Sequence, residues 1–420
     1  MAKRGLVISY YFPPSGGGGV QRWVKLLKYL SEYGWEFCVL ANDPPPGGPK
    51  DDSLLYEIPE NMQVIRTENC STADSILSKS PFLGQSGYWQ RWLSAFFRIT
   101  DSRKSWNTIA RKHITEELNR NKYDAIIFSS PPYSLAILAG EIKQEVSCPV
   151  FLDLRDPWTI NPYKIYPTKF HRWLDEHREK NSISKIDHLI SAYQSTFDDY
   201  TKRFKNFKSK NLLILPNGYD EKDFVKLNKI KPFEGGKFNL GFSGTIYSHL
   251  NTPHVVFKAI NQLKNENTDI HFHHIGTSVY DLEKLAKKYD IEDRVHSWGY
   301  HAHKKNIEIL QMMDAFCMII DDQWLHSENT IGGKFYEYLR LKKPIFAVVP
   351  EKGEAANIIN KTNSGLVVSG KNIENITQKL KSIIHNKLIF TWNGIEEFSR
   401  EKQAQDLNEF LELDHPGKDY

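Results

Sequence analysis

Short hydrophobic runs alternate along most of the chain with stretches whose hydrophobic positions recur every three or four residues. The first run covers 6–10, a loop rich in proline and glycine covers 13–19, and a second run covers 37–40. Between loop and second run, one side of a predicted helix carries Val20, Trp23, Val24, Leu27 and Leu30. With Gly34 as the helix stop, this pattern predicts a strand, a helix and a parallel strand.

The same alternation returns in two successive series. Strand-like runs at 123–129, 150–154, 188–192 and 212–215 complete the first series. The second has runs at 238–242, 270–275, 315–320 and 344–349, with a helix near 252–264. This order predicts an α/β protein of two doubly wound, Rossmann-like domains that face a central cleft. Ligands are then expected beyond the carboxyl ends of the strands.

Chain length supports this division, since 420 residues exceed what one hydrophobic core usually serves. We predict an N-terminal domain at 1–216, a C-terminal domain at 217–394, and a segment at 395–420 that packs back on the N-terminal domain. Within that segment Ile395 to Leu413 reads as a polar helix. Residues 43–62, rich in proline, glycine and acid, are expected to form a mobile loop.

The bulk composition excludes some classes of protein. A net charge of +4 is too small for binding nucleic acid by phosphate neutralisation. The four cysteines are scattered, without a Cys-x-x-Cys pair, and read as free thiols of a reducing compartment. The chain shows neither a signal-peptide core nor a hydrophobic run near 20 residues, so we expect a cytoplasmic protein.

The most informative chemistry lies at residues 331–337. Gly332 and Gly333 precede a predicted helix and leave backbone N–H groups uncovered, and Lys334 adds a positive charge for a diphosphate. Glu337, three residues on, shares a face with Lys334 and can accept hydrogen bonds from ribose hydroxyls. The alternative is an ordinary surface helix with a solvated Lys–Glu pair.

Two loops of the first domain are further candidates. Gly16, Gly17 and Gly18 could let the backbone approach a sugar and a diphosphate, or could form a simple turn. After the strand at 150–154, Arg155 and Asp156 are expected on the rim of the cleft, in an acceptor-orienting or proton-accepting role. A buried Arg–Asp pair that ties the loop to the strand is the alternative.

An aromatic residue, an aromatic and basic segment, and a histidine-rich strand are also considered as candidate sites. Trp158 follows Pro157 and could stack on an acceptor sugar. Residues 88–112 are aromatic and basic, which suits contact with a membrane interface, or alternatively a helix that buries its aromatic side chains. His271 and His273 fall on one face of a strand and His274 on the other. With no carboxylate at ligand spacing, no metal site is predicted.

Several motifs, taken in order, resemble glycosyltransferase family 4, whose members have the GT-B fold. The motifs are Tyr11 to Gly18, Leu215 to Asp220, Gly241 to Thr245, Gly333 to Leu339 with Lys343-Pro344, Glu354 to Ala356 and Ser364 to Val368. The resemblance implies transfer of a sugar from a nucleotide donor with retention of configuration and without a metal. The chain contains no Asp-x-Asp motif, which agrees with that implication.

The resemblance also implies roles for individual residues. Glu337 would hold the donor ribose, and Ile331 to Lys334 would meet the diphosphate and the sugar. Asn329 stands where the family often has a second acid. The loop with Gly244 and Thr245 lacks the arginine and lysine that commonly follow it. Lys334 is therefore expected to carry most of the positive charge.

The resemblance thus implies a metal-independent glycosyltransferase of the hexosyltransferase type. The expected donor is a UDP- or GDP-linked sugar, used as co-substrate without a further cofactor. The resemblance implies a glycan or a lipid-linked sugar as the acceptor and a role in bacterial surface polysaccharide synthesis. Residues 88–112 would give peripheral contact with the inner face of the membrane. Catalytic candidates are Lys334, Asp156 and Arg155. A nucleotide-sugar epimerase and a catalytically silent donor-binding subunit remain as alternatives.

Overall fold

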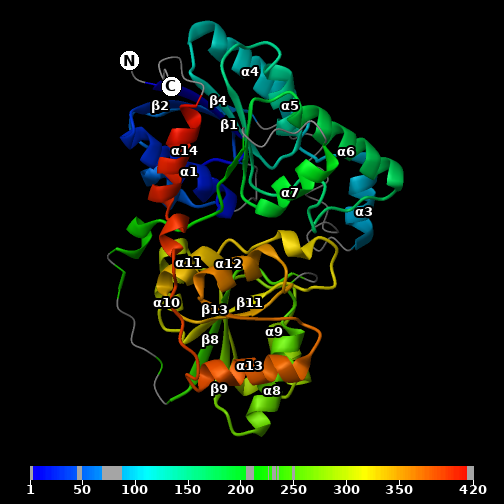
Figure 1. Cartoon of the computed structure of the whole chain (residues 1–420), viewed down its shortest axis with the longest axis vertical. Helices are drawn as coiled ribbons and strands as arrows, with labels where there is room; N and C mark the ends of the chain where they lie inside the picture. The colour runs from blue at the N-terminus through cyan, green and yellow to red at the C-terminus, as the bar shows by residue number, and fades with distance from the viewer. Residues whose placement is uncertain are drawn as a thin grey trace. The chain divides into compact units, whose positions relative to one another are not determined.

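The computed structural model describes residues 3–44, 50–68, 88–204, 212–225, 227–228, 233, 236–247 and 251–413. The chain divides into two compact units, which Figure 1 shows in full. Unit 1 comprises Met1–Asn217 and Arg400–Tyr420, and unit 2 comprises Gly218–Ser399. The two units divide one residue after the boundary that the sequence placed at 216. Each unit is described below by itself.

Unit 1 is built on a parallel sheet of seven strands in the described residues, in the order β3-β2-β1-β4-β5-β6-β7. Its strands are β1 (Lys3–Ser9), β2 (Trp35–Asn42), β3 (Gln63–Thr67), β4 (Ala125–Ser130), β5 (Val150–Leu154), β6 (His188–Ser191) and β7 (Leu212–Ile214). Its helices are α1 (Gly18–Glu32), α3 (Tyr88–Phe97), α4 (Trp106–Arg120), α5 (Ser134–Ile142), α6 (Lys169–Ile183), α7 (Gln194–Arg203) and α14 (Arg400–Leu411), with a 3-10 turn η1 (Asp52–Glu57).

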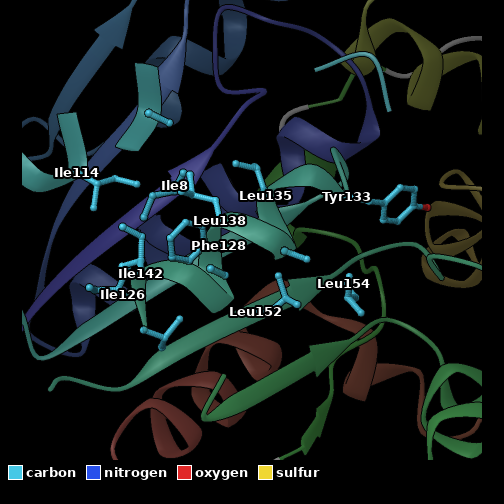
Figure 2. Packing of buried hydrophobic residues seen from close by; sticks show 14 of the residues in the cluster. Ile8, Ile114, Ile126, Phe128, Tyr133, Leu135, Leu138, Ile142, Leu152 and Leu154 are labelled. Carbon is cyan, nitrogen blue, oxygen red and sulfur yellow. The ribbon is translucent and has the colours of Figure 1, made fainter. Parts of the chain in front are cut away.

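Both faces of this sheet are buried, because successive residues of a strand point to opposite sides. Leu6 and Ile8 of β1 join the cluster that α4 and α5 cover, whereas Val7 joins the cluster on the other face. Figure 2 shows the first of these clusters, with Phe128 and Leu152 of the sheet facing Leu135 and Leu138 of α5. A continuous hydrophobic run is the sequence signature of such a strand.

On the other face of the unit 1 sheet, a helix from early in the sequence packs against one from late in the sequence. α1 and α14, blue and red in Figure 1, lie side by side. Ala404, Leu407, Phe410 and Leu411 of α14 join the cluster that α1 contributes to. The single helix expected over Ile395 to Leu413 is instead a 3-10 turn η6 (Ile395–Phe398) in unit 2 and α14 in unit 1.

Unit 2 repeats the plan with six strands in the described residues, in the order β10-β9-β8-β11-β12-β13. The strands are β8 (Phe238–Ser243), β9 (Ile270–Ile275), β10 (Val295–Gly299), β11 (Ala315–Ile319), β12 (Ile345–Val348) and β13 (Gly365–Val368). The helices are α8 (His254–Asn265), α9 (Leu282–Lys288), α10 (His303–Leu310), α11 (Phe335–Leu341), α12 (Glu354–Thr362) and α13 (Ile373–Ile384). Three 3-10 turns complete it, η3 (Glu221–Phe224), η4 (Glu292–Arg294) and η5 (Ser327–Asn329).

Most of the predicted elements are confirmed, but three strands were not expected. β3, β10 and β13 lie toward the edges of their sheets. The region 43–62, expected to be one loop, contains η1, which buries Leu54. Residues 45–49 of that prediction lie outside the described residues.

The strand order determines where each sheet can form a site. In unit 2 the order reverses between β8 and β11, and a crevice opens outside the carboxyl ends of the strands at such a point. β8 ends at Ser243, and β11 leads toward η5 and α11. Unit 1 has its own reversal between β1 and β4.

Candidate functional site

The predicted turn and helix at 331–337 form as expected. Lys334 is the N-cap residue of α11, and Gly332 and Gly333 are exposed just before it. A Cβ atom built on either glycine would meet no atom within 4 Å, so open space adjoins this stretch of backbone. α11 itself is only seven residues long. The local chemistry therefore depends mainly on the side chains at its start.

Glu337 is the central acid of this site. Its residue is only 5% exposed. The Oε1 atom accepts a hydrogen bond from Lys334 Nζ at 3.1 Å. Its Oε2 atom is buried and has no hydrogen-bond partner among the described residues. A buried carboxylate oxygen without a donor is costly, so this geometry indicates a place for a donor supplied by a ligand.

The opposite side of α11 anchors the helix in the core of unit 2. Phe335, Tyr338 and Leu339 are buried, which confirms the face predicted for them. The Tyr338 hydroxyl accepts a hydrogen bond from the Ser243 N–H at 2.6 Å, and thereby joins α11 to the end of β8. Burial raises the pKa of Tyr338 above its ordinary value, so the hydroxyl stays neutral. Lys334 and Glu337 are thus held at the carboxyl end of the sheet.

His303 completes the site and was missed by the sequence analysis. It is the first residue of α10, and its Nδ1 atom lies 3.0 Å from Lys334 Nζ. Its Nε2 atom lies 3.0 Å from Asp223 Oδ2 in η3. The chain Asp223–His303–Lys334–Glu337 therefore links three elements of unit 2. The sequence did not indicate that His303 follows a strand, because β10, which precedes α10, reads Val-His-Ser-Trp-Gly and lacks a hydrophobic run.

The Gly244 loop after β8 is fixed by its neighbours. Gly244 has φ +135°, and the His274 Nε2 atom lies 2.9 Å from its carbonyl oxygen. A Cβ atom at Gly276 would lie 2.2 Å from that oxygen, so only glycine fits there. Thr245 Oγ1 lies 3.0 Å from Thr277 Oγ1. On the α10 side, Asn306 hydrogen-bonds the Ser243 hydroxyl, which brings this loop and α10 to the same strand end.

Asn329 and Ile331 lie on the approach to α11. Both are buried, at 6% and 7% exposure, and Asn329 ends η5. The Asn329 N–H donates to the His326 carbonyl oxygen at 3.0 Å. Asn329 thus belongs to a short 3-10 turn before the predicted stretch Ile331 to Lys334, and its role toward the sugar stays a prediction.

In unit 1, the predicted glycine loop and the predicted acidic loop meet. Gly17 has φ +108° and precedes α1, which begins at Gly18. A Cβ atom at Gly19 would lie 1.5 Å from Arg155 Nη1, so the guanidinium of Arg155 fills the space that glycine leaves. Arg155 Nε also donates to Asp156 Oδ2 at 3.3 Å. Burial opposes the charge of Arg155, but Asp156 and Asp153 outweigh it and raise its pKa.

The role predicted for Trp158 is wrong. Its side chain is 0% exposed, within the core cluster of unit 1. One ring face is occupied by Tyr133, stacked at a centroid distance of 5.6 Å, and Lys164 Nζ lies 5.6 Å from the Trp158 ring centroid. The indole therefore has no free face for a sugar. Burial of this large hydrophobic surface is favourable and holds the indole in the core.

The segment 88–112 is divided between surface and core. In α3, Leu93, Phe96 and Phe97 are 51%, 41% and 79% exposed. The side chains of 88–91 lie outside the described residues. Farther along, Trp106 of α4 is buried and donates to the Thr67 hydroxyl at 2.7 Å. The alternative of a helix that buries its aromatic side chains is therefore wrong for Phe96 and Phe97 of α3 and right for Trp106 of α4.

The histidines of β9 lie as the strand pattern predicts. His271 and His273 both stack on His296 of β10, at centroid distances of 5.1 and 4.7 Å, while His274 points to the Gly244 loop. Burial, followed by repulsion from His296 and His271, lowers the pKa of His273 to about 3. The His273 imidazole is thus packed in its neutral form. Among the residues that the structure describes, no group of three or more His, Cys, Asp or Glu is placed to hold a metal ion.

Two smaller observations concern thiols and membranes. Cys38, Cys148 and Cys317 are free thiols, and burial raises the pKa of Cys38 to about 11. Cys70 lies outside the described residues. Within the described ranges, every helix is too short or too polar to cross a bilayer.

Comparisons with known proteins agree with the fold. Residues 224–404 match the family model described as "Glycosyl transferases group 1". This range contains His303, Lys334 and Glu337, and it supports a glycosyltransferase. A search of curated protein sequences found no match.

Solved structures share the architecture at low sequence identity. Sucrose-phosphate synthase from Thermosynechococcus elongatus is 14% identical, with a TM-score of 0.65 over 97% of this chain and 98% of the other. HepE from Anabaena, solved in complex with UDP and glucose, is 13% identical, with a TM-score of 0.63 over 97% and 99%. A UDP-N-acetylglucosamine 2-epimerase is 12% identical, with a TM-score of 0.59 over 100% and 97%. The chain therefore has the GT-B type of fold, with two parallel sheets of seven and six strands in its described residues.

Proposed function

We propose that the protein is a glycosyltransferase that binds a nucleotide-sugar donor on unit 2. The observation that carries this proposal is the pairing of Lys334 with Glu337, whose Oε2 atom is buried without a partner in the described chain. Two vicinal ribose hydroxyls can donate to a carboxylate of this kind. The open backbone at Gly332 and Gly333 leaves room for the diphosphate next to the ammonium group of Lys334.

The reaction we propose needs stabilisation of the departing diphosphate above all. Lys334 and uncovered N–H groups would bear the charge that develops on the leaving oxygen, an electrostatic task suited to a preorganised site. The leaving phosphate oxygen would take the proton of the acceptor hydroxyl, and the new glycosidic bond would form on the face that the phosphate leaves. Configuration would then be retained, with neither a protein nucleophile nor a metal required.

The donor we propose is a UDP- or GDP-linked hexose, and the acceptor would bind to unit 1. Arg155 and Asp156 remain candidates for orienting the acceptor, because the carboxylate of Asp156 is half-exposed at the end of β5. A glycan or a lipid-linked sugar in bacterial surface polysaccharide synthesis is the acceptor class that we propose. Gly16 to Gly18 of unit 1 remain candidates for donor binding, as the sequence predicted.

A surface of unit 1 supports contact with a membrane that carries such an acceptor. Phe97 of α3 and Trp173 of α6 are 79% and 57% exposed, and Phe170 of α6 is 60% exposed. Phe96 joins the two helices, since its ring lies 4.9 Å from that of His171. Several exposed aromatic side chains on two adjoining helices suit the interfacial region of a bilayer. We name this surface, formed by Leu93, Phe96, Phe97, Phe170 and Trp173, the α3–α6 aromatic patch.

Vesicle sedimentation tests the α3–α6 aromatic patch. Substituting Phe97 and Trp173 by serine should lower the fraction of protein that sediments with anionic phospholipid vesicles. Tyr56→Ser is the matched control, because Tyr56 is 92% exposed in η1. Equal sedimentation of the wild type, the patch variant and the control would contradict the proposed membrane contact.

The donor assignment is tested with a panel of nucleotide sugars. A ligand that binds only the folded state raises the melting temperature, by an amount that grows with its concentration relative to Kd. A donor found in this way is then incubated with the protein, first alone and then with acceptor glycans. Release of the nucleotide with transfer of the sugar supports the proposal. Isomerised sugar from donor alone would show an epimerase, and binding without turnover would show a silent donor-binding subunit.

A further inference from the structure

The charges around His303 leave the site short of a cation for a diphosphate. Four charged or titratable groups meet here, Asp223 from η3, His303 from α10, and Lys334 and Glu337 from α11. With a neutral imidazole, two carboxylates face one ammonium group. An incoming diphosphate would add negative charge beside Asp223 and Glu337, the two carboxylates among these four groups. A second positive charge at the same place would remove this conflict.

The hydrogen-bond pattern assigns His303 a neutral form in the absence of ligand. Nε2 lies 3.0 Å from the Asp223 carboxylate and must carry a proton to donate to it. Nδ1 lies 3.0 Å from Lys334 Nζ, an obligate donor, so Nδ1 is the acceptor. A proton on Nδ1 would direct an N–H group at the lysine ammonium. Lys334 therefore keeps His303 neutral as long as the Lys334 ammonium group donates to Nδ1 of the imidazole.

A bound diphosphate reverses this arrangement. Its oxygens offer Lys334 a stronger partner than a neutral imidazole, because hydrogen bonds between two charged groups are the shorter and stronger ones. Nδ1 is then released from Lys334. It can take a proton from the solvent and donate to a phosphate oxygen or to Glu337 Oε1, 3.9 Å away. Asp223 stabilises the resulting imidazolium through Nε2.

We propose that binding of a nucleotide diphosphate ester is coupled to uptake of one proton at His303 Nδ1, which makes His303 the second cation of the site. Histidine suits this role because its charge changes between pH 5 and 8. The neighbouring lysines of α10 do not supply that charge directly, since Lys305 lies 3.6 Å from Glu308 and both Lys304 and Lys305 are exposed. The inference rests on the proposed function and names the protonation step of the same site.

Calorimetry in buffers of different ionisation enthalpy measures the proton directly. The probe is UDP-glucose, or GDP-mannose if UDP-glucose does not bind. A nucleotide sugar is preferred to UDP because its phosphates are esterified and do not titrate near pH 6, as a terminal phosphate does. At pH 7.5 we expect the binding enthalpy to depend on the buffer with the sign of proton uptake. Affinity should fall as pH rises from 6.5 to 8.5, by up to about tenfold per pH unit.

Three variants make the assignment specific to His303. His303→Gln keeps a hydrogen-bonding side chain but cannot be protonated, so buffer dependence should vanish and affinity should become independent of pH. Asp223→Asn should reduce proton uptake while leaving an acceptor for Nε2. His301→Gln, two residues away in sequence and half-exposed, is the matched control and should behave as wild type.

The outcomes separate this inference from the function on which it rests. Proton uptake that is lost in His303→Gln and kept in His301→Gln supports it. Binding of a nucleotide sugar without proton uptake, or with the same uptake in His303→Gln, overturns the inference and leaves the proposed function intact. Absence of binding by every nucleotide sugar tested, in protein shown to be folded by its melting transition, overturns both.

Discussion

Asp153 in unit 1 and Glu337 in unit 2 are both buried acids at the carboxyl side of a parallel sheet, but their surroundings differ. Both oxygens of Asp153 are satisfied. Oδ1 accepts from Arg22 Nη2 at 2.8 Å, and Oδ2 accepts from Arg22 Nε at 3.0 Å and from Trp23 Nε1 at 2.7 Å. Glu337 has one satisfied oxygen and one that is buried without a partner in the described residues.

The difference separates an acid that serves the fold from an acid that serves a ligand. Arg22 also donates to the Pro216 carbonyl oxygen at 2.9 Å, so the Asp153 network ties α1 and β5 to the end of unit 1. A fully satisfied buried network rigidifies its surroundings, whereas a partly satisfied one is costly unless a further group completes it. We therefore expect substitutions at Asp153 to affect stability and substitutions at Glu337 to affect binding.

The largest expected effect is on the Asp153 side. Asp153→Ala leaves the buried guanidinium of Arg22 without its carboxylate, and breaking a buried pair in this way costs about 3–5 kcal/mol. Urea unfolding should show this loss in the free energy of unfolding. Arg22→Met combined with Asp153→Leu should recover part of it, because no charge is then left unpaired. A single variant as stable as wild type would contradict the structural role assigned to this pair.

Glycines of unit 2 extend the comparison to the backbone. A Cβ atom at Gly276 would lie 2.2 Å from the Gly244 carbonyl oxygen at φ +148°, so Gly276→Ala should lower the free energy of unfolding by about 2–3 kcal/mol through strain. Gly332→Ala should leave stability within about 0.5 kcal/mol, since open space surrounds that position. Gly332→Ala should instead weaken nucleotide-sugar binding. Thermal melts with and without ligand separate the two effects.

The histidines of unit 2 predict a dependence of stability on pH. The folded pKa of His273, about 3, lies below its ordinary value of 6.5, so between these values the unfolded chain binds more protons than the folded chain. The contribution of neutral His273 to the free energy of unfolding is therefore fully present above pH 6.5. It is lost as pH falls toward 3, by about 1.4 kcal/mol per pH unit for one such histidine. Urea unfolding from pH 7 to 5 measures the slope. An unchanged slope in His273→Gln would assign it to other groups.

A small effect on stability is also expected at Glu337 itself. Glu337→Gln removes a buried charge whose second oxygen has no donor in the described chain, so the free energy of unfolding should change by less than about 1 kcal/mol. Lys334 keeps partial contact with His303 in this variant. A loss as large as that predicted for Asp153→Ala would place Glu337 with the structural acids.

The sequence predicted the fold well where the hydrophobic signal was strong. Central strands such as β4 and β9 are buried throughout, and their runs were recognised because both faces of a parallel sheet exclude water. β10 escaped notice because its residues are only partly buried or exposed and read as polar. Edge strands gain less from burial, so the pattern of hydrophobic residues specifies them weakly.

The candidate site was predictable where neighbours in sequence are neighbours in space. Lys334, the N-cap residue of α11, and Glu337 stand three residues apart, and that spacing sufficed to pair them. His303 and Asp223 reach them only through the packing of α10 and η3, which no local pattern encodes. The prediction for Trp158 was wrong because it used only local sequence. The position after a strand indicated the rim of the cleft, but packing places the side chain in the core.

The central claim is that Glu337 and Lys334 form the nucleotide-sugar site, and calorimetric titration of Glu337→Gln tests it most directly. The probe is the nucleotide sugar that stabilises the wild type best. The account predicts that the variant, folded as judged by its melting transition, binds this ligand at least about tenfold more weakly, the loss expected for hydrogen bonds to a charged group. Glu397→Gln, at an exposed ion pair with Lys361, should bind as the wild type does. Equal affinity of Glu337→Gln and wild type would contradict the account.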